Sequence, residues 1–268
     1  MRIAVLGCGN MGLAMITGML DRIEDISIIA YDKSDDSLTR LPDEVLVVPP
    51  DEWEQSENRP DAIIIATKPL DLSDALSPFR DMDTETCNPL FISIAAGKTI
   101  ASLEKLLPRG ARICRVMPNT PALIGEAMSA YCVNSKAIES DKALAQQILS
   151  CIGQVAFVPE KLLNAVTGLS GSGPAYVYLF IEALIEGGIA AGLPYAMAKQ
   201  CAVQTVLGSA RMVAQSTDEV STLKAKVMSP AGTTVKGLMA LEEHKFKYSV
   251  IKAVVDATAR AEEIGKQD

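Results

Sequence analysis

Three glycines near the start of the sequence have the spacing that a bound diphosphate requires. Gly7, Gly9 and Gly12 form G-x-G-x-x-G between the apolar run at residues 2–6 and the helical run LAMITGML. In this motif the glycines allow a tight turn, a close approach of the backbone to a pyrophosphate, and close packing of the helix on the strand. The N-terminus of the following helix attracts the negative charge. This context favours a dinucleotide site over a structural glycine turn.

Three residues at the end of the second apolar run bear on which dinucleotide binds. Asp32 follows the last glycine by about 20 residues, where a carboxylate accepts hydrogen bonds from a ribose 2′-hydroxyl and favours NAD. Lys33 and Ser34 come directly after it. A cation beside a hydroxyl can instead hold the 2′-phosphate of NADP, and Asp32 can equally be a turn residue at a strand end. Both NADP(H) and NAD(H) therefore stay open at this point.

Three further loops follow predicted strands and are candidates for the same ligand. Ligands of open α/β sheets bind at the carboxyl ends of the strands. The segment ATKP follows one such run, SIAAG ends another with residues small enough to admit a nicotinamide ring, and RVMPNTPA is a stiff polar loop after a third. An ordinary strand-to-helix connection is an equal alternative for each of the first two. The candidate residues are Thr67, Lys68, Pro69, Ala95, Ala96, Gly97 and Asn119.

A run of small and hydroxylated residues, SPAGTT from Ser229, interrupts a helical pattern. Proline stiffens its entry, Ala231 and Gly232 clear space, and Thr233 and Thr234 supply hydroxyls. One interpretation is a capped helix start, in which Ser229 or Thr233 binds free backbone N–H groups, and spacing alone favours it. Taken alone, this stretch therefore predicts a proline-stiffened helix cap with spare hydroxyls.

These candidate residues need a scaffold, and the first part of the chain predicts a parallel sheet. Several short apolar runs lack alternation, as expected for strands that are buried on both faces. They alternate with helical patterns, which is typical of βαβ repetition and a doubly wound α/β domain. The predicted strands are residues 2–6, 27–31, 45–48, 62–67, 90–95, 112–117, 128–133 and 155–158.

After Pro159 the pattern becomes helical. Gly173 and Pro174 begin one helix, and GLSGSGPAY places Ser172 either in its cap or facing a cleft. Two apolar stripes follow. Because this part of the chain has few helices to cover them, part of the apolar surface is expected to bind a second chain. The stripes are Val203, Val206, Leu207, Ala210 and Val213, and Val250, Val254, Ala257, Ala261 and Ile264. We expect one domain at residues 1–160 and a second at 161–268.

The composition narrows the classes of partner. A net charge of -8 lacks the basic surface that nucleic acid or an anionic membrane requires, and no apolar run reaches the length of a membrane span. A small ligand or another protein chain is the better partner. The six scattered cysteines predict reduced, apolar side chains in a cytoplasmic protein, and no metal site is expected. His244, the single histidine, lies in a polar segment and is expected to be solvated.

Taken together, the motifs resemble the pyrroline-5-carboxylate reductase family over essentially the whole chain. They are GCGNMG, ATKP, SIAAG, RVMPNTPA, GLSGSGPAYVYLFIEAL and MSPAGTTVKGLMALE, in the order and spacing of that family. The last resembles the family's signature segment and is the most specific. The resemblance implies reduction of the ring imine of 1-pyrroline-5-carboxylate to L-proline with NAD(P)H. It implies a Rossmann-type domain followed by an all-α dimerisation domain, with dimers that often assemble into decamers.

The resemblance also implies roles for individual residues. The segment from Gly7 to Gly12, with Cys8, Asn10 and Met11, would hold the pyrophosphate, and Ser34 the adenosine ribose or its phosphate. Ala66 to Pro69 and Ala95 to Gly97 would contact the rest of the cofactor, for which NADP(H) is favoured. The substrate loop would be Ser229 to Thr234, with Thr234 facing the substrate as the catalytic residue and Ser172 as a further contact.

The sequence departs from the family pattern at two places. Ala231 stands where the loop usually has its first glycine, which is tolerable if the residue does not need a positive φ. The second strand ends in YDKS, where NADP-preferring members more often have arginine or a neutral residue. Two rival functions fit the sequence less well. β-Hydroxyacid dehydrogenases have a catalytic lysine four residues after a glycine pair, and this chain has Val177 at the matching place. A catalytically silent NADP sensor would not need the complete substrate loop.

Overall fold

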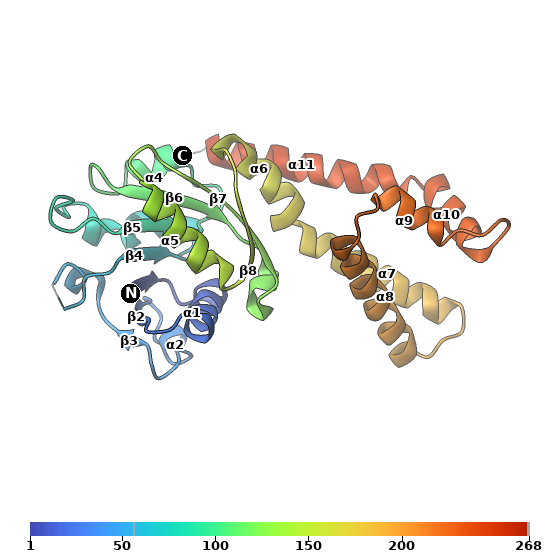
Figure 1. Ribbon diagram of the computed structural model, residues 1–268, viewed down its shortest axis with the longest axis horizontal. Helices are drawn as coiled ribbons and strands as arrows, with labels where there is room; N and C mark the ends of the chain where they lie inside the picture. Colours follow the sequence, from blue (N-terminus) through green and yellow to red (C-terminus); the bar gives the residue numbers. More distant parts are fainter. Residues whose placement is uncertain (56, 267–268) are drawn as a thin grey trace. The chain divides into compact units, whose positions relative to one another are not determined.

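The computed structural model of the chain describes residues 1–55 and 57–266. It consists of two compact units, one formed by Met1–Ser172 and the segment from Asp256 onward, and the other by Gly173–Val255. The first unit holds a sheet and the second is helical (Figure 1). In the described part of the chain no helix is long and apolar enough to cross a membrane.

The first unit is built on one eight-stranded sheet in the order β3-β2-β1-β4-β5-β6-β7-β8. All neighbours are parallel except β6 and β7, which are antiparallel. Each predicted run forms a strand, and the predicted doubly wound α/β class is confirmed. The strands are β1 (Arg2–Leu6), β2 (Ser27–Tyr31), β3 (Leu46–Val47), β4 (Ala62–Ile65), β5 (Leu90–Ser93), β6 (Arg112–Met117), β7 (Ala127–Val133) and β8 (Gly153–Phe157).

The core lies on both faces of this sheet. Successive residues of the central strands point to opposite faces, so that Ile64 joins one cluster and Ile63 and Ile65 the other. One cluster packs against α1 (Asn10–Arg22) and α5 (Glu139–Ser150), and the other contains the aromatic rings of Trp53 and Phe79. Burial on both faces explains the uninterrupted apolar runs of the sequence. The remaining helices here are α2 (Asp35–Leu38), α3 (Leu72–Ala75), α4 (Ile100–Glu104) and α6 (Leu163–Val166).

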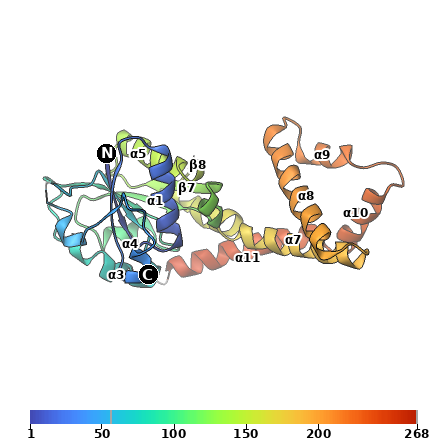
Figure 2. The same ribbon diagram turned by 90° about the horizontal axis from the view of Figure 1, so that it is seen from below.

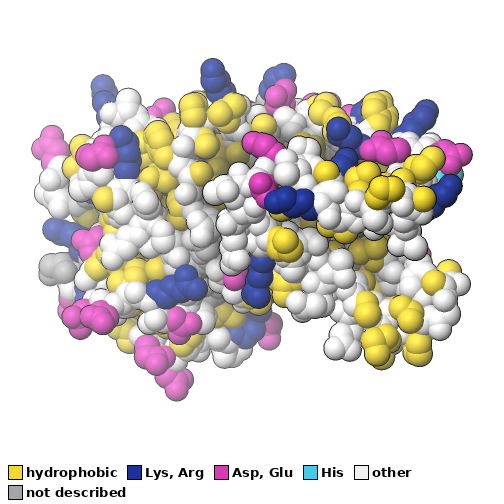
Figure 3. All heavy atoms as spheres, turned by 45° about the vertical axis from the view of Figure 1, so that its right-hand side comes forward, with side chains coloured by type: hydrophobic (Ala, Val, Ile, Leu, Met, Phe, Trp, Pro, Cys, Tyr) yellow, Lys and Arg dark blue, Asp and Glu magenta, His cyan; other side chains and the backbone are white. Residues whose placement is uncertain are grey.

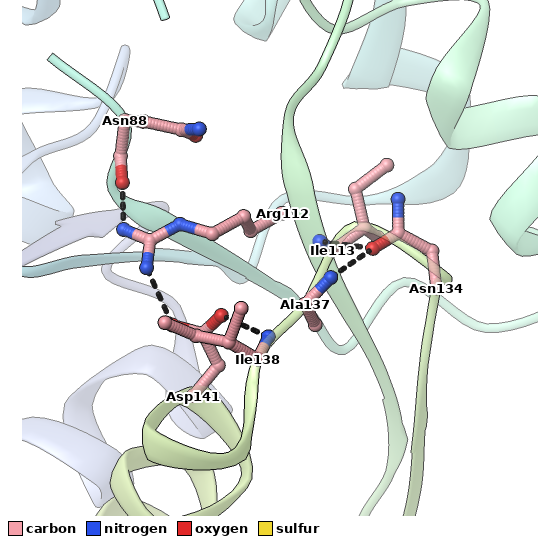
Figure 4. A network of polar contacts seen from close by, with 7 residues as sticks. All are labelled: Asn88, Arg112, Ile113, Asn134, Ala137, Ile138 and Asp141. Carbon is pink, nitrogen blue, oxygen red and sulfur yellow. Dashed lines mark hydrogen bonds and ion pairs between the residues drawn. The ribbon is translucent and has the colours of Figure 1, made fainter. Parts of the chain in front are cut away.

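A polar network fastens the amino end of β6 to α5 (Figure 4). Arg112 donates from Nη1 to Oδ1 of Asp141 at 2.8 Å and from Nη2 to the Asn88 carbonyl. Oδ2 of Asp141 accepts the N–H of Ile138 at 2.8 Å, and the residue is only 3% exposed. Nearby, the Asn134 side chain makes hydrogen bonds to backbone groups on both sides of it. Because the carboxyl ends of the parallel strands β1, β2, β4, β5 and β6 lie at the opposite edge of the sheet, this network is structural.

The second unit consists of helices with very few buried residues. They are α7 (Gly173–Ala190), α8 (Tyr195–Gln215), α9 (Val220–Lys226), α10 (Thr233–Glu243) and the first part of α11 (Phe246–Lys266). The helix predicted from Gly173 and Pro174 is confirmed as α7. α7 packs on α8, and its Phe180 ring lies 5.7 Å from that of Phe246 on α11. Figure 2 shows the long loop between α9 and α10.

The first compact unit extends past residue 160, where the change from strands to helices predicts a domain boundary. β8 ends at Phe157, but the first unit continues to Ser172. A Cβ on Gly171 would lie 2.5 Å from Cε of Met117, and Asn119 binds Ser170, so the segment after β8 packs on the sheet. The C-terminal part of α11 also belongs to this unit. Such long-range contacts leave no mark in local sequence patterns.

Candidate functional site

The glycine-rich loop joins β1 to α1, and its three glycines have different surroundings. Gly7 has a φ of 99°, and a Cβ there would lie 2.7 Å from the carbonyl carbon of Ala66. A Cβ on Gly12 would lie 2.0 Å from the Gly7 carbonyl oxygen. Turn geometry and close packing therefore require both glycines. No heavy atom lies within 4 Å of the place a Cβ would take on Gly9, so a ligand can approach its backbone there.

The first turn of α1 is open to an anion. The helix begins after Gly9, and in the described structure no side chain caps it. The N–H groups of Asn10, Met11 and Gly12 lack acceptors within the helix, as at any helix start. Together with the helix dipole they favour a negative charge at this end. The residues present thus fit the pyrophosphate of a dinucleotide.

The predicted loops after β1 and β4 come together. β1 lies between β2 and β4, where the order of the strands reverses, and such switch points are the usual ligand sites of open sheets. The N–H of Ala66 donates to the Leu6 carbonyl at 2.8 Å, which places residues 66–69 beside the glycine-rich loop. Thr67 contributes a buried hydroxyl that has no hydrogen-bond partner within the described residues. Lys68 and Pro69 begin a short 3-10 helix.

Asp32 binds the protein backbone with both of its carboxylate oxygens. Oδ2 accepts the N–H of Cys8 at 2.7 Å, and Oδ1 accepts that of Ser34 at 2.9 Å. The carboxylate therefore fastens the glycine-rich loop to the end of β2. Of the two roles considered for this residue, the structure displays the one at the strand end.

The two cations near the end of β2 have different partners. Lys33 Nζ lies 2.7 Å from Oδ1 of Asp71, which raises the pKa of the exposed lysine through a hydrogen bond and its charge. Arg40 donates to the Cys8 carbonyl at 3.3 Å and to Oδ1 of Asn10 at 3.4 Å. Sequence reasoning missed Arg40. The rule that an arginine near the second strand can accommodate a 2′-phosphate was the signal that could have found it.

The loop after β5 is held by the end of α11. Gly97 has a φ of 80°, and a Cβ there would lie 2.7 Å from Cγ2 of Ile264. Gly265 also packs near the Gly97 carbonyl oxygen. Packing of α11 thus also requires a small residue at Gly97, the residue whose size suggested room for a nicotinamide ring. Ala95 is buried and Ala96 is exposed in the same loop.

Asn119 and Ser172 lie in segments that pack on the sheet. Asn119 donates from Nδ2 to the backbone oxygen and hydroxyl of Ser170, both at 3.2 Å, and accepts the N–H of Met128 at 2.9 Å. Its amide is therefore engaged by the protein. Ser172 closes a π-helical turn, with its N–H donating to the Thr167 carbonyl at 2.9 Å, directly before α7 begins.

The predicted substrate loop forms a tight turn before α10. The N–H of Gly232 donates to the Ser229 carbonyl at 2.9 Å, and a Cβ on Gly232 would lie 2.2 Å from Oγ of Ser229. Ala231 has a φ of 56°, a conformation that costs an alanine about 1 kcal/mol. The condition under which alanine was tolerable here is therefore not met.

The capping interpretation of this loop is wrong. α10 begins at Thr233 after Gly232, and within this fully described segment no side-chain oxygen binds its first turn. The N–H groups at the start of the helix thus remain available to an anion. Thr234 lies in that first turn and is half-buried.

The buried cysteines Cys8 and Cys132 are not suited to be reactive centres. Burial raises the pKa of Cys8 to about 12 and that of Cys132 to about 11, so both thiols stay protonated and unreactive at neutral pH. Among the residues that the structure describes, no group of three or more His, Cys, Asp or Glu could hold a metal ion. His244 is exposed at the end of α10.

Comparison with protein families assigns a model to each half of the chain. A model for pyrroline-5-carboxylate reductase dimerisation matches residues 160–264. A model described as NADP oxidoreductase, coenzyme F420-dependent, matches residues 2–97. The first match indicates that the chain forms oligomers, and the second that its N-terminal sheet serves an NADP-dependent oxidoreductase.

Curated proteins and solved structures agree with these models. Proteins named pyrroline-5-carboxylate reductase from Synechocystis and Schizosaccharomyces pombe are 44% and 34% identical, over 82% and 98% of this chain and 80% and 98% of their own. The crystal structure of the Plasmodium falciparum enzyme with NADP bound has a TM-score of 0.86 at 33% identity, covering 98% of both chains. The Coxiella burnetii structure has a TM-score of 0.90 at 32% identity, over 98% of this chain and 97% of the other. The chain therefore belongs to the pyrroline-5-carboxylate reductase family.

Proposed function

We propose that this chain reduces the ring imine of 1-pyrroline-5-carboxylate to L-proline with NADPH, the last step of proline biosynthesis. The observation that carries the proposal is the match to named reductases over 98% of the chain, which includes both the glycine-rich loop and the loop before α10. A dinucleotide site alone would support only an oxidoreductase. The second loop supplies what a small carboxylate substrate requires.

Reduction of a cyclic imine does not require a strong general acid from the protein. The imine nitrogen can be protonated before the hydride arrives, so no strong internal acid is needed, and the exposed position of His244 is consistent with this. When bound, the cofactor supplies the hydride from C4 of its nicotinamide. The protein must orient the two reactants, which contributes much of the rate enhancement through proximity.

The loop before α10 is suited to hold the substrate carboxylate. The open first turn of the helix offers N–H groups and a favourable dipole, and Gly232 leaves no side chain in the way. In this proposal the Thr234 hydroxyl makes a hydrogen bond to the ring nitrogen and stabilises the developing amine. The substrate-binding residues are Ser229, Ala231, Gly232, Thr233, Thr234 and, as a further contact, Ser172.

The cofactor would be held along the carboxyl ends of β1, β2, β4 and β5. The first turn of α1 binds the pyrophosphate, the end of β2 the adenosine ribose, and the later loops the nicotinamide half. The proposed residues are Gly7, Cys8, Gly9, Asn10, Met11, Gly12, Asp32, Lys33, Ser34, Ala66, Thr67, Lys68, Pro69, Ala95, Ala96, Gly97 and Asn119. Within this set, the structure gives Asp32, Gly97 and Asn119 contacts that also position the loops.

We further propose a functional division at residue 160, with residues 161–268 contributing the substrate loop and the dimer interface. The family match over 160–264 and the exposed apolar side chains of α7 and α8 support a dimer through these helices (Figure 3). Assembly of such dimers into a decamer and a cytoplasmic location complete the proposal, and sedimentation analysis and cell fractionation test them.

One assay tests the reaction. Purified protein is mixed with 1-pyrroline-5-carboxylate and NADPH or NADH, and loss of absorbance of the reduced cofactor is followed together with proline formation. We expect turnover with proline formed in equal amount to the cofactor oxidised. Binding of NADPH without any turnover would instead identify a cofactor sensor and overturn the proposal.

A further inference from the structure

The adenosine end of the cofactor site lies between the end of β2 and the glycine-rich loop. Two charged residues there, Asp32 and Lys33, are of the types that discriminate NAD from NADP, and both bind other groups of the protein. Asp32 accepts two backbone N–H groups, one on each carboxylate oxygen. Lys33 Nζ donates a hydrogen bond to Oδ1 of Asp71 at 2.7 Å. The Asp32 carboxylate therefore holds the loop in place, and the Lys33 ammonium already has an acidic partner, which weakens its attraction for a phosphate.

Arg40 is a further cation at this place. Its guanidinium reaches across from the residues after α2 and touches Cys8 and Asn10, the two neighbours of Gly9. Those contacts are long, 3.3 and 3.4 Å, and occupy only two of its five donor N–H groups. The residue is exposed, and the space over Gly9 beside it is open. A guanidinium in this position can turn toward a ligand without losing a strong interaction.

We propose that Arg40 selects NADP(H) over NAD(H) by binding the 2′-phosphate of the adenosine ribose. The planar guanidinium matches a phosphate with paired hydrogen bonds, which an ammonium cannot do. Ser34 adds a hydroxyl at the N-terminal cap position of α2, and in the described structure that side chain makes no capping bond. The inference rests on the proposed cofactor site and assigns within it the 2′-phosphate contact that the sequence placed at Lys33.

Asp32 is compatible with a phosphate at this site. A free carboxylate would repel the 2′-phosphate, but the N–H dipoles of Cys8 and Ser34, which point at the two carboxylate oxygens, offset part of its negative charge. The Arg40 guanidinium binds the carbonyl of the same Cys8 and brings a positive charge to this end of the loop. The arrangement keeps the loop fastened while a cation faces the ligand.

Ligand fragments test the inference without turnover. Calorimetry compares adenosine 2′,5′-bisphosphate with 5′-AMP on the wild-type protein, on Arg40→Gln and on Arg80→Gln. We expect Arg40→Gln to weaken the bisphosphate about 10- to 100-fold, as for the loss of hydrogen bonds to a charged group, and to leave 5′-AMP within about twofold. Arg80→Gln is the matched control, because that guanidinium is exposed and contacts Ser73 far along the chain from this loop.

Further variants and outcomes keep the inference separate from folding defects and from the reaction itself. Arg40→Lys retains the positive charge but lacks the paired N–H donors of the guanidinium, and it should bind the bisphosphate with intermediate affinity. The assignment would be overturned if Arg40→Gln weakened the binding of both fragments equally. It would also be overturned if Lys33→Gln lost affinity for the bisphosphate while Arg40→Gln kept it. An inactive wild type that still prefers the bisphosphate would contradict the proposed reaction and leave the role of Arg40 supported.

Discussion

The sheet unit and the helical unit differ in how completely they bury their apolar residues. In β4 every residue from Ala62 to Ile65 is fully buried, as are Phe79 and Phe91 beside it. In α7, a helix of 18 residues that is mostly apolar, no residue is buried, and α8 buries only Ala198 and Ala202. Apolar surface left in water forgoes about 25 cal/mol per Å² of stabilisation. The sheet unit closes its own core, whereas the helical unit needs cover from outside itself.

The two proposed binding loops inherit this difference. The glycine-rich loop is held by backbone contacts to Ala66 and by the Asp32 carboxylate within a closed core. The loop before α10 lies in the unit with little buried surface and contains a strained residue, Ala231. We therefore expect cofactor binding to depend on local packing, and substrate binding to depend on assembly and on loop strain.

The largest effect is expected inside the sheet unit. The pair of Asp141 with Arg112 is mostly buried, with side-chain exposures of 4% and 24%. Asp141→Ala leaves the partly buried guanidinium without its carboxylate, and breaking such a pair costs about 3 kcal/mol. Urea unfolding followed by circular dichroism measures the change. Glu139→Ala is the control, because its pair with Lys142 is exposed and contributes less than about 1 kcal/mol. Equal losses in the two variants would show that this core does not depend on the buried pair.

A somewhat smaller effect tests the need of the helical unit for a partner. Leu207 on α8 is 42% exposed in the single chain, and Leu207→Glu would place a charge in the proposed interface. We expect the dimer to weaken 100-fold or more, about 2.7 kcal/mol, as seen by analytical ultracentrifugation. Gln204→Glu adds the same charge at another exposed position of α8 and should leave the dimer intact. An unchanged oligomer in Leu207→Glu would place the interface elsewhere.

The next effect concerns the substrate loop itself. Thr234→Ala removes the proposed hydrogen bond to the ring nitrogen and should lower kcat/KM for 1-pyrroline-5-carboxylate by about tenfold or more. NADPH affinity, measured by fluorescence titration, should stay unchanged because the cofactor residues lie in the sheet unit. Activity within twofold of wild type would remove Thr234 from the mechanism.

The smallest effect isolates the strain in the same loop. Ala231→Gly relieves the left-handed backbone at φ 56°, worth about 1 kcal/mol, although the added freedom of glycine in the unfolded chain offsets part of it. We expect KM for the substrate to change severalfold with little effect on NADPH binding. Steady-state kinetics provide the measurement, and unchanged KM with raised thermal stability would show that the strain has no part in substrate binding.

Much of the fold was predictable because the relevant forces are local. Doubly buried strands require continuous apolar runs, so all eight strands could be found from the sequence, and the glycine spacing located the start of α1. The antiparallel pairing of β7 was not predictable, because its apolar run reads the same in either direction. The extent of the first compact unit to Ser172 depends likewise on contacts between distant segments, such as that of Gly171 with Met117, which local sequence patterns do not encode.

The candidate site divides in the same way. The sequence by itself predicted which loops would carry the chemistry, from the combination of glycines, hydroxyls and prolines at strand ends and helix starts. Only the tertiary structure decided what individual residues do there. It showed that Asp32 binds two backbone N–H groups, that Gly97 makes room for Ile264, and that Arg40 reaches the glycine-rich loop. These roles depend on contacts between residues of distant segments, and residue type and spacing do not encode such contacts.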